Sequence, residues 1–152
     1  MYFPFVIGTM LVLPLASAGI DLWLHPDLPL MLALGRWFVF WGAGVRLIAA
    51  GLKQTLQPEF TAKEIFKLKT DEAFPIVREL GISNFAGGVV GIASVFAPSF
   101  LLPIAIYATI FYGAAGIGHI GQKDRSANEN LALCTDLLIA VVLLAFVIWS
   151  VA

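Results

Sequence analysis

The stretch that decides the fold is LMLALGRWFVFWGAGVRLIAAGLKQTL, residues 30–56. It is long enough to cross a bilayer, since a transmembrane helix needs about 20 predominantly apolar residues. Two arginines, Arg36 and Arg46, lie inside it. Ionisable groups in hydrocarbon cost roughly 2.5–3.5 kcal/mol each on insertion scales, so they usually face a partner or a wet cavity. The stretch therefore predicts a membrane helix whose two charges are satisfied by other parts of the protein.

Four more apolar runs fill most of the remaining chain, which has 152 residues. A composition of 60% hydrophobic and 12% charged residues excludes an ordinary soluble domain. We expect a single membrane domain, residues 1–152, built as an all-α integral membrane bundle of five transmembrane helices. These helices are expected at about residues 3–23, 30–56, 74–96, 100–120 and 129–151.

Composition and motifs exclude several classes of function. The net charge of −1 gives no support for a nucleic-acid partner. Cys134 is the only cysteine, which rules out an intrachain disulfide, a C-x-x-C redox pair and a cysteine metal cluster. No phosphate loop or nucleophile elbow is present. We therefore assign no catalytic residue and expect no metal site and no intrinsic cofactor.

A charged segment separates the second and third apolar runs. Between residues 59 and 70, apolar Phe60, Ile65 and Leu68 are interspersed with lysines and a glutamate. The pattern suits a short interfacial helix lying at the membrane surface. A solvated loop explains the same residues, and the sequence leaves both interpretations open.

The basic residues predict the orientation in the membrane. All seven that lie outside Arg36 and Arg46 fall in connections on one side of the five-helix topology. They are Lys53, Lys63, Lys67, Lys69, Arg78, Lys123 and Arg125. The positive-inside rule then places the N-terminus inside and the C-terminus outside. We expect a multi-pass membrane protein, in the inner or plasma membrane if its source is bacterial.

Four helices each carry one polar residue at a similar depth. With a rise of about 1.5 Å per residue, Arg46, Asn84, Tyr112 and Asp136 all lie roughly 9–12 Å from the inner surface. Because an apolar cavity with a few convergent polar groups is the usual form of a small-molecule site, this layer predicts one. The ligand-binding candidates are Arg46, Asn84, Tyr112 and Asp136, with Glu79 and His119 nearer the inner boundary.

Arg46 and Asp136 form the natural pair, because an arginine fork matches a carboxylate in two parallel hydrogen bonds. Three roles stay open for them: a buried salt bridge that fixes helix register, a wet ligand pocket, and a proton or ion path. His119 is either a proton donor and acceptor or a hydrogen-bonded residue between helices. For Arg36 the alternatives are pairing with Asp21 and extension toward the outer head groups.

From Arg36 onward the chain resembles the DoxX-like small membrane proteins. The matching features are Arg36, Gly51-Leu52-Lys53, Pro58, the apolar-basic stretch through Phe66, Glu79-Leu80, Gly87-Gly88, Gly91 and Gly118-His119. The resemblance implies a compact membrane bundle, typically of four helices. It also implies a hydrophobic ligand such as a quinone or lipid, since some members are associated with quinone-linked redox complexes. This chain departs from the pattern in its added first helix and in its uncharged turn at Ala97-Pro98-Ser99.

Three functions follow as hypotheses. The first is a ligand-binding or accessory subunit that holds a quinone-like or lipid-like molecule. The second is a proton-coupled transporter or channel component, and the third is a structural subunit of a membrane complex. The expected partners are the lipid bilayer and either another membrane protein or a second copy of this chain.

Overall fold

The computed structural model describes residues 2–65, 68–121 and 125–152, and all regular elements in these ranges are helices. The first membrane helix consists of α1 (Tyr2–Ile7), η1 (Gly8–Val12) and α2 (Leu13–Leu24). The second consists of α3 (Leu30–Phe38), η2 (Val39–Val45) and α4 (Arg46–Leu56). Both middle segments, η1 and η2, are π-helical.

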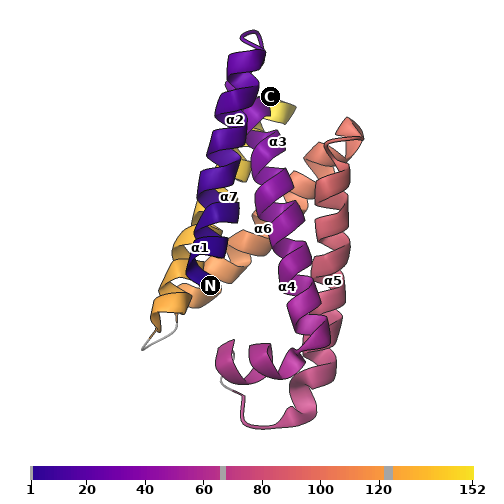
Figure 1. The fold of residues 1–152 in the computed structure, drawn as a ribbon, viewed down its shortest axis with the longest axis vertical. Helices are drawn as coiled ribbons and strands as arrows, with labels where there is room; N and C mark the ends of the chain where they lie inside the picture. The colour runs from indigo at the N-terminus through magenta and orange to yellow at the C-terminus, as the bar shows by residue number, and fades with distance from the viewer. Residues whose placement is uncertain (1, 66–67, 122–124) are drawn as a thin grey trace.

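The rest of the chain continues the up-and-down path (Figure 1). A short π-helical segment, η3 (Phe60–Ile65), and a 3₁₀ turn, η4 (Asp71–Ala73), lead into α5 (Phe74–Ala93). A second 3₁₀ turn, η5 (Pro98–Phe100), opens α6 (Leu101–Ile120), and α7 (Ala127–Val151) ends the fold.

Five of these helical stretches are long and apolar enough to cross a membrane, which confirms the expected five-span bundle. The third ends at Ala93 rather than at the expected Phe96. There the N–H groups of Val95 and Phe96 bond three residues back, to Ile92 and Ala93, which tightens the chain into a turn before Pro98. The fifth begins at Ala127, because Ser126 and Glu129 form a capping box at its start.

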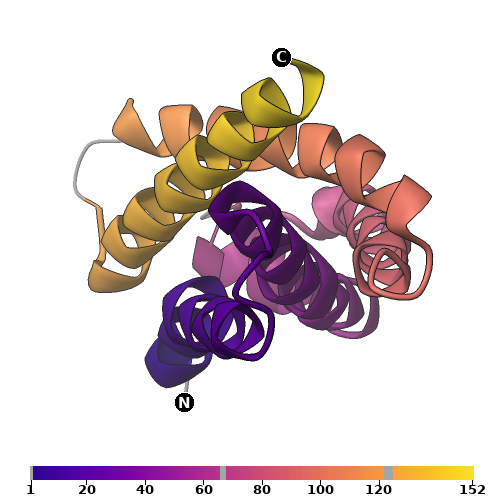
Figure 2. The same cartoon turned by 90° about the horizontal axis from the view of Figure 1, so that it is seen from above.

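The second span is the centre of the bundle. It contacts α2, α5, α6 and α7, and in Figure 2 the other helices surround it. Of its most apolar window 44% is buried, against 28–33% for the other four spans. Arg36 and Arg46 therefore lie on the most buried of the five helices.

Glycines bring the backbones of the second and third spans together. A Cβ added to Gly51 would lie 2.5 Å from the carbonyl oxygen of Gly81, and one on Gly91 would lie 2.8 Å from the Cα of Gly44. Such contacts leave no room for any side chain, as in other closely packed membrane helices. Three of the glycines of α5, Gly81, Gly88 and Gly91, therefore serve close packing at this interface.

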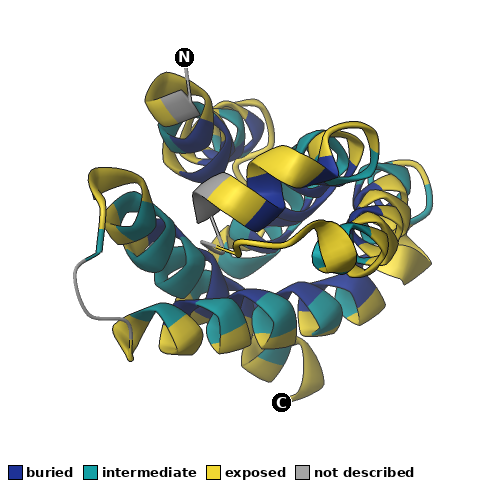
Figure 3. Cartoon of the chain, turned by 90° about the horizontal axis from the view of Figure 1, so that it is seen from below, coloured by how far each residue is buried: buried dark blue, intermediate teal, exposed yellow. Residues whose placement is uncertain are grey.

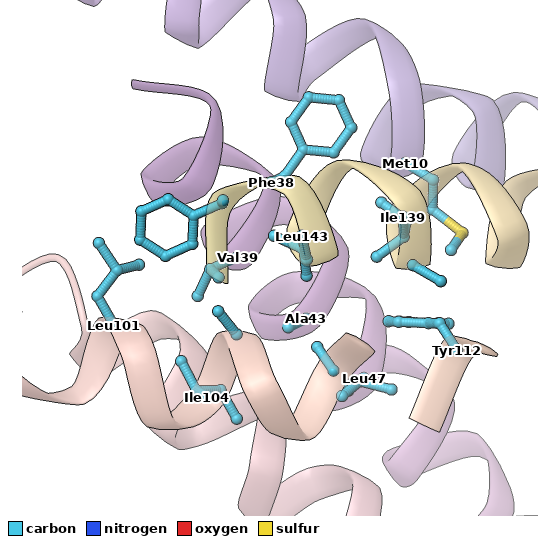
Figure 4. Packing of buried hydrophobic residues seen from close by; sticks show 14 of the residues in the cluster. Met10, Phe38, Val39, Ala43, Leu47, Leu101, Ile104, Tyr112, Ile139 and Leu143 are labelled. Atoms are coloured by element: carbon cyan, nitrogen blue, oxygen red, sulfur yellow. The ribbon is translucent and has the colours of Figure 1, made fainter. Parts of the chain in front are cut away.

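The hydrophobic core lies where the second span meets α6 and α7 (Figure 4). Phe38, Val39 and Leu47 pack there against Ile139 and Leu143. Exposed residues gather on the outer surfaces of the helices (Figure 3), and many of them are large and apolar. Exposed apolar surface of this extent is typical of a face that contacts lipid.

The charged connection is helical only in its first half. Within the interfacial helix expected over residues 59–70, η3 ends at Ile65 and residues 68–70 are not helical, while residues 66–67 lie outside the described ranges. Thr61 and Ala62 are buried and η3 contacts α4 and α5. An ion pair of 2.9 Å between Lys63 and Asp71 links η3 to the start of the next span. The segment thus packs on the bundle.

Candidate functional site

His119 and Asp136 face each other across the hairpin formed by α6 and α7. Nε2 of His119 lies 3.9 Å from Oδ2 of Asp136. The two helices pack along each other, and Gly116 allows this because a Cβ there would lie 2.7 Å from the Leu137 side chain. The side chains of His119 and Asp136 remain 18% and 14% exposed. The pair is therefore sheltered and still reachable by a ligand atom.

The π-helical segment of the second span brings Arg46 and Tyr112 to the same region. The buried Tyr112 hydroxyl donates a hydrogen bond of 2.6 Å to the carbonyl oxygen of Gly42, one turn before Arg46. Arg46 interacts electrostatically with both Asp136 and Tyr112. Three of the six predicted ligand-binding residues, from α4 and α6, thus gather around a fourth, Asp136 on α7. A direct contact between Arg46 and Asp136 stays a prediction.

Asn84 is buried on α5, and the structure brings it to a residue that sequence reasoning missed. Its Nδ2 donates a hydrogen bond of 2.8 Å to Oε1 of Gln54 on α4. Gln54 lies eight residues after Arg46, about 12 Å along the helix. The Oδ1 atom of Asn84 is buried and makes no hydrogen bond to the described residues. Asn84 therefore forms a polar contact of its own between α4 and α5.

Glu79 is exposed on α5. Its neighbours two positions away on either side, Val77 and Gly81, are buried. Since successive helix residues are about 100° apart, Glu79 points away from the face that they form. The structure thus separates Glu79 from the group around Asp136.

A second polar cluster lies near the turn between α2 and α3. The carboxylate of Asp21 accepts hydrogen bonds from Arg36 at 3.0 Å and Trp37 at 2.9 Å, and pairs with His25 at 3.0 Å. Pairing of Arg36 with Asp21, one of the two expected alternatives, is confirmed. Sequence reasoning missed Trp37 and His25, although His25 follows Asp21 by four residues and therefore shares its helix face.

A shallow pocket of about 220 Å³ opens beside this Asp21 cluster, lined by Ser17, Ile20, Asp21, Leu24 and Trp37. Its one ionisable residue, Asp21, is only 7% exposed and already receives three partners. Ser17 accepts a hydrogen bond of 3.0 Å from Trp41. The polar atoms here are engaged within the protein, so the cluster suits the joining of α2 to α3 better than the recognition of a polar ligand.

Metal binding has no support from geometry. Among the residues that the structure describes, no group of three or more His, Cys, Asp or Glu side chains is placed to hold a metal ion.

Residues 4–152 match the model of a family of unknown function, DUF6790, and the chain belongs to this family. No curated protein and no solved structure matches it. These comparisons do not connect the chain to the DoxX-like proteins, and that resemblance stays a prediction from short motifs.

Proposed function

We propose that this protein is a small membrane-embedded binding or accessory subunit that holds the polar head of a quinone-like or lipid-like molecule. The observation that carries the proposal is the sheltered pair of His119 and Asp136, 3.9 Å apart and partly accessible. Ionisable groups within membrane spans usually mark sites where a substrate, an ion or a proton is handled. Here one of the two, Asp136, also lies within the electrostatic influence of Arg46.

These side chains offer complementary hydrogen-bonding groups. Arg46 supplies only donors, the ionised Asp136 supplies only acceptors, and the His119 ring can do either. A quinone carbonyl or a phosphate oxygen would accept from Arg46 or His119, and a hydroxyl would donate to Asp136. The apolar tail of such a molecule would lie in the surrounding bilayer, which the exposed apolar faces of the helices contact.

The orientation belongs to the same proposal. With the N-terminus inside, the α6–α7 connection faces the cytoplasm and the His119–Asp136 pair takes its ligand in the inner leaflet of the inner or plasma membrane. Exposed Lys69 and Ser99 lie in connections on opposite sides. We expect a membrane-impermeant maleimide to label Ser99→Cys in intact cells and to leave Lys69→Cys unlabelled, in a background with Cys134 replaced by Ser. Labelling of Lys69→Cys alone would show the opposite orientation, with the N-terminus outside.

The same pair supports a second function, as a proton-coupled transporter or channel component. The specific observation is that two titratable side chains meet across adjacent spans, because proton relays in membrane proteins use such chains of acidic and histidine groups. In proteoliposomes that carry a pH-sensitive dye, a proton flux lost in Asp136→Asn would favour this function. Ligand binding without flux would favour the first.

Binding is tested with the full chain in mild detergent. We expect mass spectrometry to find a quinone or a defined lipid that co-purifies with the protein in stoichiometric amounts. Asp136→Asn and His119→Gln should retain at least about tenfold less of it, which corresponds to about 1.4 kcal/mol of binding free energy. Asp27→Asn, an exposed carboxylate in the α2–α3 turn, is the matched control. Equal retention in all four proteins would leave the pair with a structural role only.

A further inference from the structure

Arg125 lies between the end of α6 and the start of α7 and contacts both. Its NH1 group donates hydrogen bonds of 3.0 Å to the carbonyl oxygens of His119 and Ile120, the last two residues of α6. Its Nε donates a hydrogen bond of 3.0 Å to Oδ1 of Asn130, in the first turn of α7. One guanidinium therefore joins the two helices that carry the His119–Asp136 pair.

Arg125 contacts α6 at its C-terminal end, where the hydrogen bonding within the helix is incomplete. The last four carbonyl groups of an α-helix have no partner within the helix, and a cation near the C-terminus is stabilised by the helix dipole. Since helix ends fray, a contact to the last carbonyl groups restrains a residue one position before the end. His119 is that residue, and its own carbonyl group is held.

Arg125 contacts α7 in a first turn that is stabilised by a capping box. Ser126 and Glu129 close the first turn of this helix with reciprocal hydrogen bonds of 2.7 and 3.3 Å, so Asn130 starts from a fixed position. Asp136 follows Asn130 by six residues, about 9 Å along the same helix. The guanidinium thus links the backbone at His119 to the helix that presents Asp136.

We infer that Arg125 is a positioning residue that holds His119 opposite Asp136, so that its contacts to the adjoining ends of α6 and α7 set the geometry of the site. The 3.9 Å separation is already at the long end for an ion pair, and a further displacement of about 1 Å would separate the two groups. That this geometry matters for a ligand rests on the proposed function. That Arg125 sets it is a separate claim, which can be tested without any ligand.

The test uses the fact that the chain has two histidines, His25 and His119. Histidine-selective ¹⁵N labelling of the full chain in detergent micelles gives one ring spectrum from each, and His119→Gln assigns them. We expect Arg125→Gln to shift the His119 ring signals in the direction produced by Asp136→Asn and to leave those of His25 unchanged. Arg125→Lys, which keeps the charge and loses the forked geometry, should give a smaller shift.

Two further variants separate positioning from general damage. Asn130→Ala removes the contact to α7 alone and should move His119 in the same direction, whereas Arg78→Gln, an exposed basic residue on α5, should not move it. Wild-type His119 signals in Arg125→Gln, or an equal shift in Arg78→Gln, would overturn the inference. If the His119 signals shift as expected while no quinone or lipid binds to wild-type protein, the proposed function fails and the positioning role stands.

Discussion

Two carboxylates inside membrane spans, Asp21 and Asp136, differ in how completely the residues that the structure describes satisfy them. Asp21 has three partners within hydrogen-bond distance, and these join α2 to α3. Asp136 meets His119 at 3.9 Å, beyond the length of a hydrogen bond, in the electrostatic field of Arg46. The adjoining ends of α2 and α3 and those of α6 and α7 lie toward opposite ends of the bundle (Figure 1). Under the proposed function, Asp21 is a structural carboxylate at one end of the bundle and Asp136 is the binding carboxylate at the other.

The largest effect on stability is expected at the satisfied carboxylate. Asp21→Asn removes the charge that Arg36 pairs with and leaves the sheltered donors of Arg36 and Trp37 poorly matched, at a cost of about 2–3 kcal/mol. Thermal unfolding in detergent should show the loss, and Asp27→Asn in the adjacent turn should show almost none. A stability of Asp21→Asn equal to that of wild type would contradict a structural role for the Asp21 cluster.

A smaller loss of stability, about 1 kcal/mol, is expected for Asp136→Asn, because its 3.9 Å contact with His119 is weaker than a direct hydrogen bond. Its main consequence should be loss of ligand. The assignment of roles is supported if Asp21→Asn is the less stable variant and still binds the ligand. It is contradicted if Asp136→Asn is the less stable of the two, since Asp136 would then be the structural carboxylate.

The smallest effect is expected from a methyl group placed between α6 and α7. Gly116→Ala puts a Cβ 2.7 Å from a Leu137 side-chain carbon, and this flexible side chain has to shift. We expect a loss of about 1 kcal/mol or less and a displacement of His119 relative to Asp136. Gly118→Ala, where an added Cβ has no neighbour within 4 Å, should be neutral or slightly stabilising. Equal unfolding temperatures for the two variants would show that this contact does not set the helix spacing.

The sequence predicts the fold well, because each span is an apolar run whose length matches the thickness of the bilayer. For Arg36 it offers pairing with Asp21 as one of two alternatives, and the structure shows that pairing. It does not predict that His119 meets Asp136 or that Asn84 meets Gln54. These contacts depend on how each helix is rotated and crossed, which small contacts such as Gly116 with Leu137 decide. Depth along a helix can be counted from a sequence, whereas the direction of a side chain around a long apolar helix cannot.

The most direct measurement locates the ligand. The purified full chain is illuminated with a photoreactive short-chain quinone, or with a photoreactive phospholipid, and the adducts are mapped by peptide mass spectrometry. We predict adducts on the segments that carry His119 and Asp136. They should be reduced by an excess of the same quinone or phospholipid without the photoreactive group, and they should be lost in Asp136→Asn. Adducts confined to the pocket beside Asp21, at Ser17, Ile20 or Leu24, would contradict the proposal and place the binding site at the other end of the bundle.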